Sequence, residues 1–262
     1  MPGKKRLGIC YSGQPRDIYH THENHHARLI IPNLDEFDID IFAHIWLPPN
    51  SEGGGTASEI RSLIAECWNP TEIVYEEGRS FDTGRLVPDP RFPWPIDNSI
   101  SMFFSMWRSF GVLSDYAARH SLRYDCVVRM RSDCYFKGPL GKLADYDLSG
   151  LNVYEWLEPK PHLDYAVHDH FGFGDFDVMK IYNDVYPHVF EICEAGAAVN
   201  PEHILGFHLR THNVVVNGHP WDICLWKQKE RPPTYQRFIK RTRRSLRKRI
   251  VKIPELIGWR TP

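Results

Sequence analysis

The sequence lacks closely spaced cysteine pairs, long apolar runs and a secretory signal. Its six cysteines are scattered, and no CxxC pair occurs among them, which argues against a zinc ribbon and against a disulfide framework. No apolar run approaches the roughly 18 residues that a membrane-spanning helix needs. The N-terminal MPGKKRLGICYSG holds too few apolar residues for a signal peptide. We therefore expect a cytoplasmic protein.

The net charge is only −1 over 262 residues, but basic and acidic residues are unevenly distributed along the chain. Residues 227–262 contain thirteen Lys and Arg against two acids, whereas residues 1–226 contain 19 basic and 31 acidic residues. Hydrophobic content of 42% and charged content of 25% are ordinary for a globular protein. These values predict an acidic domain over residues 1–226 and a basic tail over residues 227–262.

The basic tail has an amphipathic pattern. A helix is expected over residues 235–250, on which Arg and Lys flank an apolar side made of Tyr235, Phe238, Ile239, Leu246 and Ile250. Helices of this kind bind the surface of anionic membranes, so residues 235–253 predict peripheral attachment at the inner face of a membrane. The alternative is a helix that packs on the acidic domain. We expect no nucleic acid partner, because the apolar side favours a membrane.

Short apolar runs alternate with helical patterns in the acidic domain. Strands are expected at 7–11, 38–46, 72–76, 126–128, 151–156 and 214–216, and helices at 18–31, 57–68, 99–120, 176–194 and 201–211. The segment 218–223 is expected to be a loop, and no strand is assigned to 168–174. The alternation predicts an α/β fold with a mostly parallel, Rossmann-like central sheet flanked by helices.

The most informative stretch is YDCVVRMRSDCYF, at 124–136. Cys126–Val128 has the composition of a strand buried on both faces, and Arg129, Arg131 and Asp133 follow at its carboxyl end. Ligands of open α/β sheets bind outside the carboxyl ends of the strands. Arginines hold phosphate oxygens there, and an aspartate holds a divalent cation. The alternative is that Asp133 caps a turn and that the arginines are solvated or ion-paired.

The first expected strand ends in a second candidate segment, SGQPR at 12–16. Gly13 lets the backbone approach a ligand because it has no Cβ, and Arg16 can pair with phosphate. Parallel strands end at the same edge of a sheet. We therefore expect Gly13, Gln14 and Arg16 beside Arg129 and Arg131, with all five in contact with one anionic group.

Five motifs in a fixed order carry a family resemblance. They are SGQPR, DIDIFAHIW (38–46), YDCVVRMRSD (124–133), HFGFGDFDVMKIY (170–182) and PEHILGFHL (201–209). Together, over roughly residues 7–226, they resemble GT-A type glycosyltransferases of bacterial and viral polysaccharide synthesis. The resemblance implies a GT-A-like fold and a nucleotide-sugar donor whose sugar passes to a saccharide or lipid-linked acceptor in surface polysaccharide or glycolipid synthesis.

The resemblance also implies Mn²⁺ or Mg²⁺, which the family binds through an Asp-x-Asp motif. Here the first Asp is replaced, and the motif reads Arg131-Ser132-Asp133. Asp133 is expected to hold the metal together with the diphosphate, and His219 is a second candidate ligand. A single carboxylate with substrate phosphates suffices for Mg²⁺. The alternative is that Arg129 and Arg131 neutralise the diphosphate directly.

Sugar transfer further needs a carboxylate that accepts the proton of the acceptor hydroxyl. Four acids lie in suitable segments, namely Asp169, Asp175, Glu202 and Asp222. Asp169 lies in the glycine-containing HDHFGFG, and Glu202 follows Pro201 at the start of an expected helix, so these two are the predicted catalytic bases. A turn for Asp169 and a helix-dipole interaction for Glu202 are the alternative interpretations.

Two other function classes remain open from the sequence. The segment His20-Thr21-His22-Glu23-Asn24-His25 is similar to the HxHxDH motif of metallo-β-lactamase-type zinc hydrolases, although Asn24 replaces the Asp. A zinc-dependent hydrolase that uses the cluster His20–His26 is therefore the alternative enzyme. The other alternative is a non-enzymatic membrane-binding module in which the basic tail is the active part.

Overall fold

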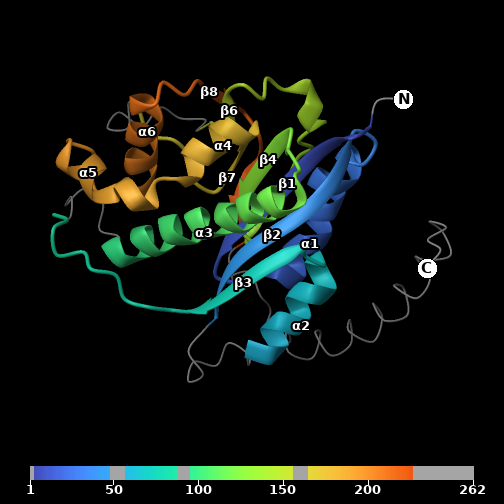
Figure 1. Ribbon diagram of the computed structural model, residues 1–262, viewed down its shortest axis with the longest axis horizontal. Helices are drawn as coiled ribbons and strands as arrows, with labels where there is room; N and C mark the ends of the chain where they lie inside the picture. Colours follow the sequence, from blue (N-terminus) through green and yellow to red (C-terminus); the bar gives the residue numbers. More distant parts are fainter. Residues whose placement is uncertain (1–2, 48–56, 88–94, 156–164, 227–262) are drawn as a thin grey trace. The chain divides into compact units, whose positions relative to one another are not determined.

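The computed structural model describes residues 3–47, 57–87, 95–155 and 165–226 (Figure 1). Its strands are β1 (Lys5–Gly13), β2 (Phe37–Leu47), β3 (Glu72–Glu77), β4 (Cys126–Met130), β5 (Cys134–Phe136), β6 (Leu151–Tyr154), β7 (Phe171–Gly174), β8 (Val216–His219) and β9 (Ile223–Leu225). Its α-helices are α1 (Ile18–His25), α2 (Ala57–Trp68), α3 (Ile96–His120), α4 (Phe176–Asn183), α5 (Val189–Glu194) and α6 (Pro201–Thr211).

Seven of these strands form one sheet in the order β3-β2-β1-β4-β7-β6-β8. The first four strands of this order are parallel, whereas β7 runs antiparallel to both β4 and β6, and β8 runs parallel to β6. A separate antiparallel pair joins β5 to β9. The predicted α/β class, with a mostly parallel sheet flanked by helices, is confirmed, and the sheet is mixed because of β7.

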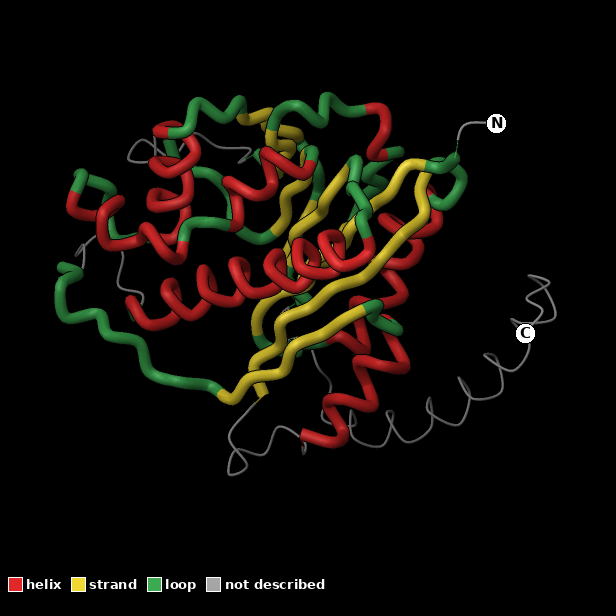
Figure 2. The backbone as a smooth tube through the Cα atoms, in the orientation of Figure 1, coloured by secondary structure: helices red, strands yellow, loops and turns green. Residues whose placement is uncertain are grey.

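Helices cover both faces of the sheet, so successive residues of its strands are buried on opposite sides. Ile9 and Tyr11 of β1 belong to the apolar core on the side of α1 and α2, and Cys10 between them belongs to the core on the side of α3. This alternation follows from the two-residue period of a strand. Figure 2 shows α3 running across the strands. The central strand β4 is buried at every residue, because both of its faces are covered.

The long helix α3 lies close to β1. A Cβ at Gly8 would overlap the side chain of Leu113, so a larger residue at this position would force that side chain to move. The helix begins directly after Pro95, three residues before its expected start at 99, and it ends at Ser121 in the left-handed conformation. On its apolar side Phe103, Phe104 and Phe110 are buried, whereas Trp107 is exposed.

Three expectations for the second half of the chain are wrong. Residues 171–174 form β7, in which Phe171 and Phe173 are buried beside β4. The helix expected at 176–194 is two helices, α4 and α5, separated by a short turn that contains Pro187. The loop expected at 218–223 is partly strand, because Gly218 and His219 end β8 and Ile223 begins β9.

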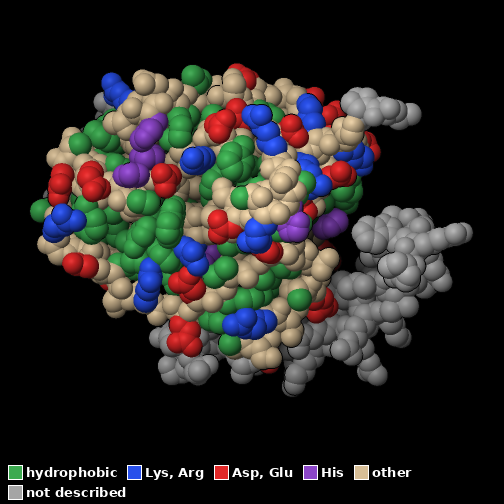
Figure 3. All heavy atoms as spheres, viewed as in Figure 1, with side chains coloured by type: hydrophobic (Ala, Val, Ile, Leu, Met, Phe, Trp, Pro, Cys, Tyr) green, Lys and Arg blue, Asp and Glu red, His purple; other side chains and the backbone are tan. Residues whose placement is uncertain are grey.

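The predicted tail helix at 235–250 and the membrane segment at 235–253 lie outside the described residues. Among the helices that the structure describes, none combines the length and the apolar character that crossing a membrane requires. Basic and acidic side chains are interspersed over the face shown in Figure 3.

Candidate functional site

A cavity of about 520 Å³ lies at the carboxyl ends of β1, β2 and β4. Its wall combines the turn after β1, Trp46 of β2, the segment after β4, the residues before β7, the first half of α3 and the first turn of α6. A volume of this size is within the range of small-molecule sites. Five motifs named in the sequence analysis therefore meet around one cavity.

Most of the predicted site residues line this cavity. They are Gly13, Gln14, Arg16, Arg129, Arg131, Asp133, Asp169 and Glu202. Parallel pairing explains the first six, because β1 and β4 end at the same edge. The antiparallel strand β7 begins at that edge, with Phe171 opposite Met130, which brings Asp169 there as well.

The turn after β1 and the segment after β4 hold each other in place. Gly13 has a φ of 112°, which favours glycine, and the side chain of Arg16 donates from Nε to Oε1 of Gln14 at 2.8 Å. The hydroxyl of Ser132 donates to the backbone oxygens of Gln14 and Arg16, at 2.8 and 3.2 Å. The two loops thus form one connected rim.

Arg129 is the most unusual residue of the cavity, because it is a fully buried cation in the strand β4. Its Nε donates to Oγ of Ser12 at 3.0 Å, and its Nη1 has no hydrogen-bond partner among the described residues. The indole Nε1 of Trp46, which also lines the cavity, is likewise without a partner there. A buried guanidinium is costly unless an anion compensates it. The cavity wall therefore has donors suited to an anionic ligand.

Asp133 is engaged by Arg131 through both carboxylate oxygens, with Nε–Oδ1 at 2.9 Å and Nη2–Oδ2 at 3.0 Å. Burial opposes the charge of Arg131, but Asp133 outweighs burial and raises the pKa of Arg131. A carboxylate whose two oxygens are both held by a guanidinium does not fit the role of a metal ligand. We accordingly derive no step through a metal at Asp133.

His219, the second predicted metal ligand, is not among the residues that line the cavity. Its Nε2 lies 2.8 Å from Oδ1 of Asn152, and its ring stacks on Trp221 with centroids 4.5 Å apart. The predicted pair of Asp133 and His219 is therefore not brought together. The sheet explains this, since β8, which carries His219, is three places away from β4.

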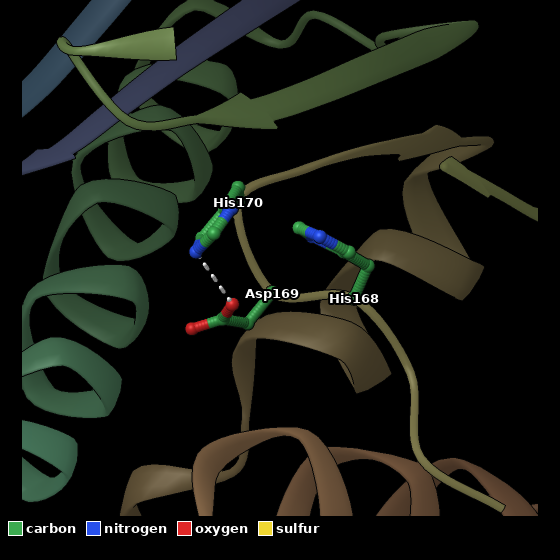
Figure 4. Close-up of side chains that lie close together, drawn as sticks. All are labelled: His168, Asp169 and His170. Carbon is green, nitrogen blue, oxygen red and sulfur yellow. Dashed lines mark ion pairs between the residues drawn. The ribbon is translucent and has the colours of Figure 1, made fainter. Parts of the chain in front are cut away.

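Asp169 lies in a compact group with His168 and His170, just before β7 (Figure 4). The side chain of Asp169 is 6% exposed, and its Oδ1 is 3.3 Å from Nε2 of His170. Burial raises the pKa of Asp169, but His170 and the neighbouring arginines outweigh it and hold that pKa below its usual value. Burial lowers the pKa of His170.

Glu202 reaches the cavity on the first turn of α6. The side-chain oxygen of Asn200 accepts hydrogen bonds from the backbone N–H of Glu202 and of His203, at 3.1 and 3.3 Å, and Pro201 occupies the first helical position. The backbone oxygen of Glu202 accepts from the N–H of Val167 at 3.0 Å. These contacts fix the start of α6 against the segment that carries Asp169.

The other two acids considered as bases lie elsewhere. Asp175 is the N-cap of α4, where its Oδ1 accepts from the N–H of Val178 at 2.8 Å. Asp222 pairs with Lys137 at 3.2 Å on the surface. Each has a local structural partner, and neither lines the cavity.

The histidines of the segment 20–26 do not form a metal site in the structure. His25 is buried, with Nδ1 at 3.2 Å from the hydroxyl of Tyr11 and Nε2 at 2.6 Å from the backbone oxygen of Cys134. Nδ1 of His22 contacts the backbone oxygen of Ile18. Within the described part of the chain, His168, Asp169 and His170 are the one group of three or more His, Cys, Asp or Glu placed to hold a metal. The cluster proposed for a zinc hydrolase is therefore not assembled.

Several lining residues escaped the sequence analysis. They are Ser12, Trp46, Asn98, Ser99, Ser101, Met102, His170, Asn200, Pro201 and Leu225. Two of them had a usable signal, since Trp46 ends an expected parallel strand and His170 belongs to a His-x-His sequence. The α3 residues had none, because their place depends on how the helix crosses the sheet.

Comparison with known proteins gives no family assignment. No protein-family model matches this chain, and no curated protein matches it.

Proposed function

We propose that this protein is a glycosyltransferase that moves a sugar from a nucleotide-sugar donor to a saccharide or lipid-linked acceptor. The observation that carries the proposal is the buried guanidinium of Arg129, whose Nη1 has no partner among the described residues. It lies in the wall of a cavity at the carboxyl edge of a mostly parallel sheet, where such sheets bind ligands. All five resembling motifs, which begin at Ser12, Asp38, Tyr124, His170 and Pro201, contribute residues to that wall.

The arginines take the part of diphosphate ligands in this proposal. Departure of a nucleoside diphosphate develops negative charge on the phosphate oxygens, and preorganised donors in a cavity stabilise such charge more strongly than water does. Arg129 is buried and fixed by Ser12, so it needs little reorganisation. Arg16 and Arg131, on the rim, extend the cationic surface.

Glu202 is the better of the two candidate bases. The low pKa of Asp169 makes that carboxylate a weak proton acceptor, because its charged form is already stabilised by His170 and two arginines. Glu202 lines the same cavity from another element. We assign it to deprotonation of the acceptor hydroxyl and regard Asp169 as a contributor to the charge balance.

The finer expectations belong to the same proposal. They are a GT-A-like version of the α/β fold, a role in surface polysaccharide or glycolipid synthesis, a cytoplasmic location, and peripheral attachment of the tail to an anionic membrane. The motif order supports the first two, and the basic, amphipathic composition of residues 235–253 supports the last. Deletion of residues 227–262 should release the protein from anionic liposomes, and undiminished binding would exclude this attachment.

The proposal is tested by release of nucleoside diphosphate from a panel of nucleotide sugars, with and without oligosaccharide acceptors. We expect one donor class to be consumed by the wild type, with a strong loss in Arg129→Met and in Glu202→Gln. Arg123→Met, at an exposed position, is the matched control and should retain the wild-type rate. Equal rates in Arg129→Met and the control would overturn the proposal.

A further inference from the structure

We infer that a divalent transition-metal ion binds to His168, Asp169 and His170 in the wall of this cavity. This site replaces Asp133 as the expected metal site. Only the coupling between the metal and a diphosphate rests on the proposed function. Two features of the described residues carry it: three ligand groups already lie together, and the carboxylate that the motif resemblance nominates is held by Arg131.

The geometry of the group suits a shared ion. The three ligand atoms, one from each residue, all lie within 4.8 Å of one another. The rings of His168 and His170 meet edge to face with centroids 4.4 Å apart, and His168 also packs edge to face on Tyr154. Figure 4 shows the side chains of Asp169 and His170 directed toward one another, with His168 beside them. A small inward movement brings all three onto one ion.

The chemistry of the ligands selects the kind of metal. Two imidazoles and one carboxylate favour Zn²⁺, Mn²⁺, Co²⁺ or Fe²⁺, whereas Mg²⁺ prefers an all-oxygen set. Three protein ligands leave open positions on the ion, as in metal sites that bind a substrate. Because Asp169 and His170 line the cavity, the open positions are available to a ligand bound there.

The charges around the site predict that metal and anion bind together. The buried group contains two guanidiniums, Arg129 and Arg131, and two carboxylates, Asp133 and Asp169, so a divalent cation alone adds uncompensated positive charge. A diphosphate in the cavity supplies the missing negative charge and phosphate oxygens for the open positions. Each ligand should therefore raise the affinity for the other by the same factor, typically about 5- to 150-fold for coupled sites.

A carboxylate that binds a metal is not free to accept a proton from the acceptor hydroxyl. Asp169 is therefore a metal ligand in this account, and Glu202 remains as the base.

The test is a titration of the EDTA-treated full chain with Co²⁺, followed by its visible absorption, with and without inorganic pyrophosphate. The variants are His168→Ala, which leaves the cavity lining intact, and Asp169→Asn as a second, milder change. Asp133→Asn addresses the competing site, and His212→Ala, at an exposed position, is the matched control. Thermal melting of each variant verifies that it is folded.

We expect one Co²⁺ per wild-type chain, bound more tightly with pyrophosphate, and unchanged binding in His212→Ala. Asp133→Asn removes a nearby negative charge and should weaken Co²⁺ binding less than loss of a ligand does. His168→Ala and Asp169→Asn should each weaken Co²⁺ binding by at least about 10- to 100-fold. That range is typical for loss of an outer-shell partner, and loss of a ligand should cost at least as much. Absence of wild-type binding, equal binding in His168→Ala, or loss confined to Asp133→Asn would overturn the inference. Nucleotide binding in EDTA reports separately on the proposed function, which survives a failure of the metal site.

Discussion

Arg131 and Asp133 bind each other through two parallel hydrogen bonds, at 2.9 and 3.0 Å, directly after the central strand β4. The motif resemblance expects two carboxylates and a metal at this place. A guanidinium supplies the positive charge here instead, in the bidentate geometry that arginine and carboxylate prefer. The carboxylate of Asp133 thereby compensates Arg131, and Nη1 of Arg129 remains a buried donor without a hydrogen-bond partner among the described residues.

The first prediction concerns that ion pair. Asp133→Ala should lower the free energy of unfolding by about 2–4 kcal/mol, because it leaves the largely buried guanidinium of Arg131 without its partner. Asp133→Asn should cost less, since its amide oxygen still accepts a hydrogen bond. Urea unfolding measures both. Asp35→Ala, at an exposed position, should change stability by less than about 0.5 kcal/mol, and an equal effect at 133 and 35 would contradict the role of the pair.

The second prediction separates binding from stability at Arg129. Arg129→Met should keep the fold, because the methionine matches the apolar surroundings of the arginine stem and removes an unpartnered donor. Pyrophosphate binding should weaken about 10- to 150-fold, the value of a hydrogen bond to a charged group. Calorimetric titration measures the affinity. Retention of wild-type affinity in a folded Arg129→Met protein would show that the anion binds elsewhere.

The third prediction concerns acid sensitivity. Burial lowers the pKa of His25 to about 4, below its value of about 6.5 in an unfolded chain, so the unfolded state binds the proton more readily. Stability from this residue is therefore complete above about pH 6.5 and declines as the pH falls toward 4, by about 3 kcal/mol. His25→Gln should flatten the dependence of unfolding free energy on pH over that window. His120→Gln, at an exposed position, is the control and should leave the slope of unfolding free energy against pH unchanged. An unchanged slope in His25→Gln would show that His25 is not the source of the acid sensitivity.

The fourth prediction concerns the packing of α6 against the segment that leads to Asp169. A Cβ at Gly206 would clash with the backbone oxygen of Tyr165, so Gly206→Ala should destabilise the protein by about 1–3 kcal/mol and disturb the cavity. Gly111 in α3 has open space around it, and Gly111→Ala should stabilise by about 0.5–1 kcal/mol. We expect Gly206→Ala to lower the melting temperature and Gly111→Ala to raise it. A change in the same direction for both substitutions would contradict the packing described.

Composition and periodicity were sufficient to predict the parallel half of the sheet. The runs that became β1 and β4 are mostly apolar, because both faces of these strands are covered, and their carboxyl ends were correctly expected to meet. The positions of Gly13, Arg129 and Arg131 around one cavity follow from that rule alone.

The rest of the site depended on contacts that sequence patterns do not encode. The segment 171–174 was not assigned to a strand, because two of its four residues are glycines, which are poor strand formers. Its antiparallel pairing with β4 is what brings Asp169 and His170 to the cavity. The pairing of Arg131 with Asp133 was one of two alternatives for a charged segment, and only side-chain geometry distinguishes them.

The most direct test of the central claim is thermal melting of the full chain with a panel of nucleoside diphosphates and nucleotide sugars, each with EDTA or with Mn²⁺. One nucleotide class should raise the melting temperature, since a ligand at a hundred times its dissociation constant stabilises a fold by about 2.7 kcal/mol. The shift should be lost in Arg129→Met and kept in Arg123→Met. No shift with any nucleotide under either condition, or an equal shift in Arg129→Met, would contradict a nucleotide-sugar site in this cavity.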